Sequence, residues 1–161
     1  MLLLNGPVAS IAQEGYLQRP ELLAEVKECL RFTYNCEFPE ARSYQRSLDL
    51  QTPSHPAPLF LEALIVYWEN FPLAPETREG ELFISLMEES VDRAQSMIES
   101  ENDHMEGIFF DLFGRAFQAM FWADNGRAAR VIPDLPNMYR RTKEGFEMKE
   151  EFVEFYFSTG L

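Results

Sequence analysis

Cysteine and histidine are scarce in this sequence, with two of each in 161 residues. Cys29 and Cys36 would lie roughly 10 Å apart on one helix at 1.5 Å per residue, beyond the reach of a disulfide. We therefore expect two small, apolar core thiols. Zinc ligands usually come in closely spaced pairs, and Cys29, Cys36, His55 and His104 are not paired in this way. The sequence thus predicts no metal site and no cofactor.

Positive charge and long apolar runs are also in short supply. The chain has 14 basic residues against 27 acidic ones and a net charge of −13. Such a surface repels nucleic-acid phosphate and anionic lipid, so neither is expected as a partner. No segment approaches the run of about 18 apolar residues that spans a membrane. A hydrophobic content of 46% nevertheless argues against disorder and favours one domain with its own core.

Catalytic motifs are absent from the sequence. It has no glycine-rich phosphate loop and no dinucleotide-binding fingerprint. His55 stands between Ser54 and Pro56 without the context of a nucleophile. The segment Glu101–His104 has the spacing of half a di-iron carboxylate motif, but the second half is missing. We therefore predict that the protein is not an enzyme.

Helical periodicity fills most of the chain. Pro20 and Pro39 suit the first turn of a helix because their missing N–H groups need no partner there. Asp103 and Glu106 form a capping box, and Gly126 is a typical helix stop. Apolar residues recur at three- and four-residue spacing between these signals. We expect helices at about 20–34, 39–50, 57–71, 78–101, 106–126 and 127–148, the last with a kink at Pro133 and Pro136, and the start of another helix at 150.

The segment 106–126 is expected to be the central helix, because it contains five of the 14 phenylalanines. Four of its positions resemble the first helix of the tetratricopeptide repeat, in which a small residue lets neighbouring side chains enter: Phe110, Phe113, Gly114 and Phe117. The turn and second helix of that repeat are similar to Asn35–Ala41, Tyr44, Leu48 and Pro53. The resemblance covers most of 20–161. It implies an all-α fold of antiparallel helical hairpins stacked as a tetratricopeptide-like right-handed α-solenoid, with about six to seven helices.

The pattern is also similar to repeat proteins of the Bacteroidetes group, which are usually exported. Tyr34-Asn35, His55–Pro58 and Phe155–Leu161 carry this resemblance. Residues 1–19 are expected to be an N-terminal extension, and 20–161 the repeat domain, truncated at its C-terminal end. Within 1–12, a short apolar run precedes small residues as in the end of a signal peptide. This favours an exported, periplasmic or cell-envelope location, and a cytoplasmic one is the alternative.

The resemblance implies a concave face that binds extended peptides. On 106–126 the polar residues Asp111, Arg115 and Gln118 would face this groove, and from 57–71 Tyr67 and Trp68 would supply aromatic contacts. Asp111 and Arg115 are spaced to pair with each other, so a solvated polar stripe with one internal ion pair is the alternative interpretation. The sequence therefore predicts a non-enzymatic scaffold that binds a peptide or protein partner. A carrier or sensor of an apolar small molecule is the rival function, and a homodimer through exposed helical ends is a further expected association.

Overall fold

All regular structure in the described part of the chain is helical. The computed structural model describes residues 15–100 and 104–147, and no strand occurs within them. The elements are η1 (Tyr16–Gln18), α1 (Pro20–Tyr34), α2 (Phe38–Gln51), α3 (Pro56–Glu69), α4 (Arg78–Glu99), α5 (His104–Asp124), η2 (Ala128–Asp134) and α6 (Leu135–Glu147). The predicted all-α fold class is confirmed.

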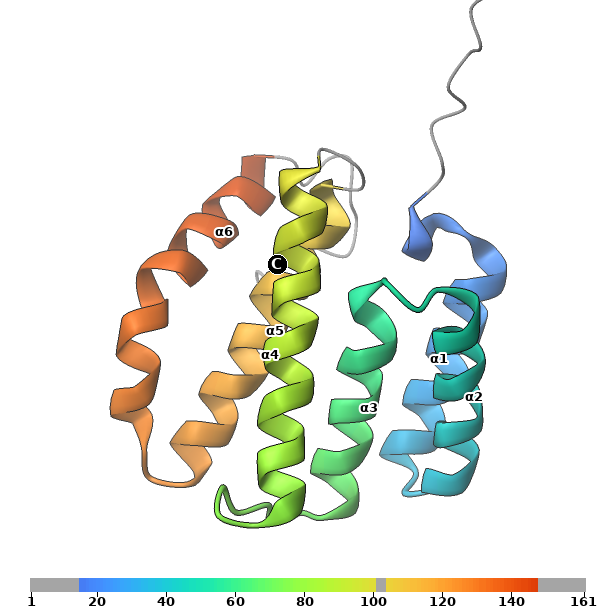
Figure 1. Ribbon diagram of the computed structural model, residues 1–161, viewed down its shortest axis with the longest axis horizontal. Coiled ribbons are helices and arrows are strands. Elements are labelled where there is room, and N and C mark those ends of the chain that lie inside the picture. Colours follow the sequence, from blue (N-terminus) through green and yellow to red (C-terminus); the bar gives the residue numbers. More distant parts are fainter. Residues whose placement is uncertain (1–14, 101–103, 148–161) are drawn as a thin grey trace, which may run out of the picture.

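The helices follow one another in space as they do in sequence. Helices α1, α3 and α5 descend in Figure 1, whereas α2, α4 and the η2–α6 segment rise, so neighbours are antiparallel. Each helix packs against the next one, and α3 also contacts α1 and α5. This arrangement is consistent with an all-α helical repeat fold. The narrower resemblance to the tetratricopeptide repeat stays a prediction.

Proline, glycine and capping side chains set the helix boundaries. Helices α1, α2 and α3 each have proline in the first turn, where the missing N–H costs no hydrogen bond. The hydroxyl of Thr77 accepts a hydrogen bond from the Gly80 N–H and caps α4. Gly126 has a φ of 69° just after α5. This left-handed conformation is typical of the glycine that ends a helix, as predicted.

Proline interrupts the segment after Gly126, as predicted. Residues Ala128–Asp134 form a 3-10 helix that contains Pro133, and α6 begins directly afterwards with Pro136 in its first turn. Several predictions fall outside the described residues: the signal-like segment 1–12, Asp103 of the capping box, Glu101 of the iron-type motif and the helix expected from 150.

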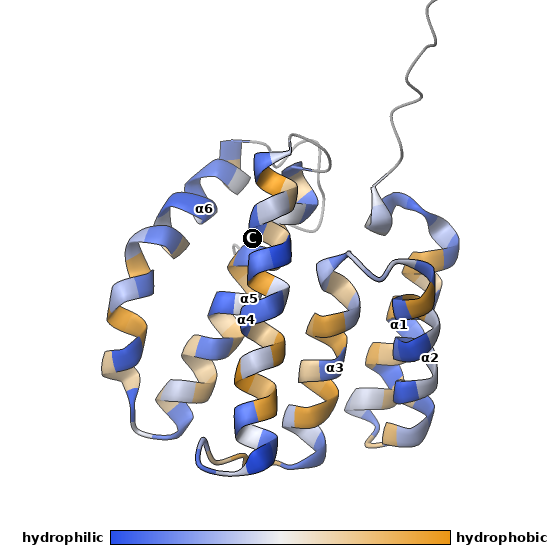
Figure 2. Cartoon of the chain, in the orientation of Figure 1, coloured by the Kyte–Doolittle hydropathy of each residue, from blue (hydrophilic) through white to orange (hydrophobic). Residues whose placement is uncertain are grey.

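The buried core runs through α1 to α5 and is centred on α3. Figure 2 shows mostly apolar residues along α3, while the other helices carry more polar residues. Ten of its side chains are buried, because α2 and α4 cover it from two sides. Fully buried Phe83, Met87, Ile108 and Phe121 continue this core through α4 and α5. The prediction that α3 is covered on two sides is confirmed.

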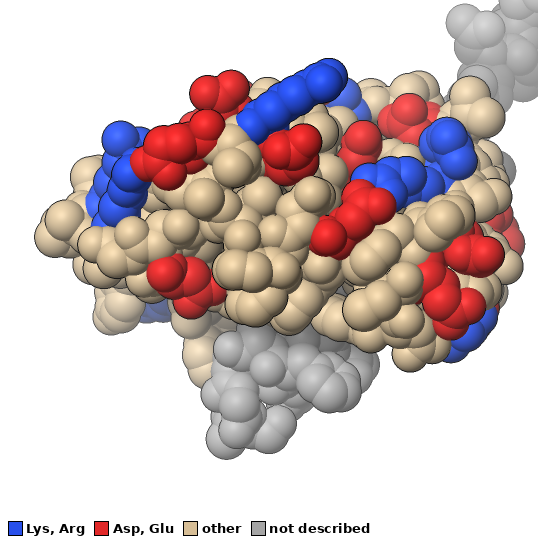
Figure 3. Space-filling model, turned by 90° about the horizontal axis from the view of Figure 1, so that it is seen from below, with Lys and Arg blue, Asp and Glu red and all other residues tan. Residues whose placement is uncertain are grey.

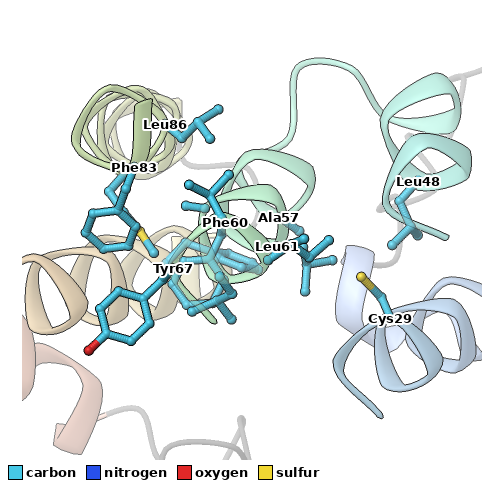
Figure 4. Packing of buried hydrophobic residues seen from close by; sticks show 14 of the residues in the cluster. Cys29, Leu48, Ala57, Phe60, Leu61, Tyr67, Phe83 and Leu86 are labelled. Carbon is cyan, nitrogen blue, oxygen red and sulfur yellow. The ribbon is translucent and has the colours of Figure 1, made fainter. Parts of the chain in front are cut away.

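The two cysteines differ in their surroundings. Cys29 of α1 is buried and lies against Leu48 of α2 (Figure 4), and its thiol contacts the Ala41 carbonyl at 3.4 Å. Burial raises the pKa of this thiol to about 11. Cys36 is exposed, so the expectation of two core thiols is wrong for it. It occupies the turn after α1 with a φ of 61°, and this turn faces solvent.

Glycine allows α5 to approach α4 closely. A Cβ atom on Gly114 would lie 2.7 Å from Cγ2 of Val91, and one on Gly107 would lie 2.7 Å from Cγ1 of Ile98. Real side chains do not approach this closely, so the glycines make room for the branched residues of α4. The predicted role of Gly114 as a small packing position is confirmed.

Candidate functional site

Three large exposed aromatic side chains lie at the C-terminal ends of α1 and α3, which are at the bottom of Figure 1. We call Tyr34, Trp68 and Phe71 the aromatic end cluster; their exposed fractions are 57%, 36% and 57%. Tyr34 ends α1, Trp68 lies at the end of α3, and Phe71 follows α3. The ring centroid of Trp68 is 5.8 Å from that of Tyr34 and 5.9 Å from that of Phe71. The three rings therefore form one continuous aromatic surface.

Tyr67 packs against the buried side of this cluster. Its ring is buried and contacts Trp68 edge-on at 5.3 Å and Phe83 at 5.5 Å. Its hydroxyl points away from the apolar cluster (Figure 4) and donates a 2.8 Å hydrogen bond to Oδ2 of Asp124. Burial, and next the bond to Asp124, raise the pKa of Tyr67 to about 12. Of the two aromatic residues predicted on this helix, Trp68 is accessible and Tyr67 holds it in place.

The loop that carries Phe71 is anchored on both sides. Asn70 caps α3, and its side-chain amide donates to the Val66 carbonyl at 2.9 Å. Leu73 is buried, and its carbonyl accepts a 3.0 Å hydrogen bond from Nδ2 of Asn125. These contacts fix the backbone on each side of Phe71, so its exposed ring stays next to Trp68.

Charged side chains around the cluster form ion pairs with one another. The Arg42 guanidinium donates to both carboxylate oxygens of Glu69, at 3.0 and 2.5 Å. Arg31 pairs with Glu28 at 2.6 Å, and Arg127 pairs with Glu76. Figure 3, which looks onto this end, shows uncharged surface between the charged side chains.

The polar residues predicted on α5 lie in a different place. Asp111 is buried where α4, α5 and α6 meet, and it accepts 3.2 Å hydrogen bonds from Gln95 and Arg115. Its second oxygen is 3.3 Å from Nε of Arg141 on α6, without the geometry of a hydrogen bond. The predicted pairing of Asp111 with Arg115 is confirmed, and the arginine of α6 is a partner that the sequence did not indicate.

Arg115 also connects α5 to the segment that follows it. Its Nη1 atom donates to Oδ1 of Asp134 at 2.6 Å, and its side chain is 11% exposed. Gln118, one turn further along α5, is partly exposed. The contact of Asp111, Arg115 and Gln118 with a partner stays a prediction.

A second buried polar group joins η1, the start of α3 and the first turn of α5. The Glu106 carboxylate is buried and accepts a hydrogen bond from the Tyr16 N–H, and it lies 3.4 Å from Nε2 of His55. The Tyr16 and His55 rings stack at 4.1 Å, while Nδ1 of His55 caps α3 by accepting the Ala57 N–H. Sequence analysis missed this group, because its members are distant in the chain and no local pattern connects them.

The described ranges contain neither a candidate metal site nor a candidate membrane-spanning helix. Among residues 15–100 and 104–147, no three or more His, Cys, Asp or Glu side chains gather in a way that would hold a metal ion. No helix in these ranges combines the length and apolar character needed to cross a membrane.

Comparison with known proteins gave no relative. A scan against protein-family models, a search of curated proteins and a search of solved structures each found no match to this chain. The resemblance to tetratricopeptide repeats therefore rests on the sequence pattern and the order of the helices.

Proposed function

We propose that the protein is a non-enzymatic helical scaffold that binds a protein or peptide partner through the aromatic end cluster. One observation carries the proposal: the Trp68 ring contacts those of Tyr34 and Phe71 at the surface, and each of the three is more than a third exposed. Contiguous exposed apolar surface is typical of interaction sites. Tryptophan and tyrosine are also the residues that most often dominate binding energy.

The rigid support of the cluster favours binding over simple exposure. Tyr67 packs under Trp68 and is itself held by Asp124, and the Phe71 loop is fixed by Asn70 and Asn125. A surface that is already ordered loses little conformational entropy when a partner docks.

The proposal places the main contact at Trp68 and not at the polar residues of α5. Asp111 and Arg115 already have partners inside the chain. A ligand would have to break these buried contacts before it could use the same side chains, at a free-energy cost of several kcal/mol.

Selection from a displayed library of short random peptides tests the proposal. We expect the immobilised protein to enrich binding peptides, and we expect Trp68→Ala and the Tyr34→Ser/Phe71→Ser double variant to weaken them at least about tenfold, as hot-spot truncation does. The double variant changes only residues that are more than half exposed, so its fold should be retained. Circular dichroism would verify this.

Leu50→Ser is the matched control. Leu50 is a highly exposed apolar residue near the end of α2, and α2 runs opposite to α1, so Leu50 lies at the other end of the molecule. Peptides should bind this variant as they bind the original protein. Equal loss in Leu50→Ser and in the cluster variants, or no enrichment at all, would refute the proposal.

A further inference from the structure

The charges near the aromatic end cluster are unevenly matched. Three arginines at this end form ion pairs with glutamates: Arg31 with Glu28, Arg42 with Glu69, and Arg127 with Glu76. Two carboxylates next to the cluster, Glu37 and Asp124, are exposed and form no ion pair within the described residues. Glu37 precedes α2 shortly after Tyr34, and Asp124 accepts the hydrogen bond from Tyr67. Negative charge is therefore exposed next to the cluster, and the Arg31 guanidinium attracts Glu37 without forming an ion pair with it.

The helix dipoles add to the negative potential at this end of the molecule. Helices α1, α3 and α5 all end at this side of the molecule (Figure 1), and a helix C-terminus carries a partial negative charge. Tyr34 and Trp68 belong to the last turns of α1 and α3. Helices α2 and α4 begin here, but Glu40 and Glu79 in their first turns offset the positive ends.

Aromatic faces elsewhere in the chain already hold cations. The Arg31 guanidinium carbon lies 3.9 Å from the centre of the Phe32 ring, and that of Arg130 lies 4.5 Å from the centre of the Trp122 ring. Within the described residues, no cation covers the rings of Tyr34, Trp68 or Phe71. Electron-rich ring faces beside exposed carboxylates are a favourable place for a guanidinium or ammonium group.

We infer that the partner segment received by the aromatic end cluster is basic, with arginine or lysine side chains lying on the exposed rings and near Glu37 and Asp124. This inference rests on the proposed function and specifies its partner by charge. A second copy of the chain fits poorly, because each copy carries a net charge of −13 and the two would repel. An acidic segment is disfavoured for the same reason.

Three displayed peptide libraries test the inference. They share the same random positions and differ only in fixed residues, which are arginine and lysine, glutamine, or glutamate. We expect the basic library to enrich at least about tenfold more than the other two, since like charges at an interface disfavour the wrong partner. Replacing arginine by glutamine in a selected basic peptide should weaken its binding, and added salt should do the same.

A pair of charge variants locates the effect on the protein. Glu37→Gln should weaken a selected basic peptide by roughly twofold to fivefold, the range for one exposed charge contact. Glu37 makes no side-chain capping bond to α2, so this change should leave the helix intact. Glu99→Gln is the matched control, since Glu99 is an exposed glutamate near the end of α4, at the opposite end of the molecule, and its binding should not change.

The outcomes separate the inference from the proposed function. Enrichment of the glutamine or glutamate library to the same level, with binding lost in Trp68→Ala, would overturn the basic partner and leave the aromatic docking surface in place. Enrichment of no library would overturn both. Equal effects of Glu37→Gln and Glu99→Gln would overturn the placement of the cation beside Tyr34.

Discussion

The backbone N–H of Tyr16 donates a 2.8 Å hydrogen bond to the buried carboxylate of Glu106, so the beginning of the described chain is fixed to the first turn of α5. Nε2 of His55, the residue that caps α3, lies 3.4 Å from the same carboxylate, and the His55 ring stacks on the Tyr16 ring. One buried acid thus holds three segments together. A carboxylate in such a place is stabilising only while these contacts persist.

Replacing Glu106 by alanine should therefore destabilise the protein strongly. The change leaves the Tyr16 N–H without its acceptor and removes the carboxylate next to Nε2 of His55. We expect a loss of about 2–4 kcal/mol in the free energy of unfolding. Urea denaturation measures this value. The exposed Glu99 is the control position, where Glu99→Ala should change stability by less than about 0.5 kcal/mol. Equal effects at both positions would contradict the role of Glu106.

Tyr67→Phe should remove the support of Asp124 and alter the response to alkali. The lost hydrogen bond should cost about 1 kcal/mol near neutral pH. Because the pKa of Tyr67 is raised to about 12 in the folded protein and the unfolded value is about 10, the folded state keeps its proton longer. Its contribution to stability is complete below pH 10 and declines as the pH rises towards 12.

Unfolding experiments across this pH range, with and without the substitution, measure the effect. The original protein should lose stability more steeply than Tyr67→Phe between pH 10 and 12. Tyr16 and Cys29, whose pKa values are raised to about 12 and about 11, mainly by burial, contribute to the decline in both proteins and cancel in the comparison. Parallel curves would contradict the assignment to Tyr67.

Arg115→Glu should loosen the segment that follows α5. The new carboxylate would face Asp111 and Asp134 and leave a buried acid with one cation fewer, at a cost of about 3 kcal/mol or more. Hydrogen exchange should then speed up in η2 and α6. Arg140→Glu, at an exposed position of α6, is the control and should leave exchange nearly unchanged. If Arg115→Glu keeps its stability, Arg115 does not fasten η2 to α5.

Gly114→Ala should strain the contact between α5 and α4. Its Cβ atom would lie 2.7 Å from Val91 Cγ2, and overpacking of this kind costs about 1–3 kcal/mol. The gain in helix propensity, roughly 1 kcal/mol, offsets part of this cost. In a double-mutant cycle, Gly114→Ala should be better tolerated together with Val91→Ala, which removes the obstructing methyl groups. Strictly additive effects would show that the two residues are not coupled.

Local sequence determined most of the fold. Proline in the first turns, Gly126 and the three- and four-residue spacing of apolar side chains act within one or two helical turns, so the helix limits and the break at Pro133 follow from neighbours in the chain. The apolar surface of α3 likewise indicated a helix covered on two sides. These features need no knowledge of which helices meet.

The tertiary structure alone decided which side chains are accessible. Tyr67 and Trp68 are adjacent and were predicted as equivalent contacts, yet one is buried and the other exposed, because α4 covers only one direction of α3 at that point. The partners of Asp111 on α6 and of Glu106 on η1 are distant in sequence. Side chains so far apart meet only through helix packing, which no local pattern encodes.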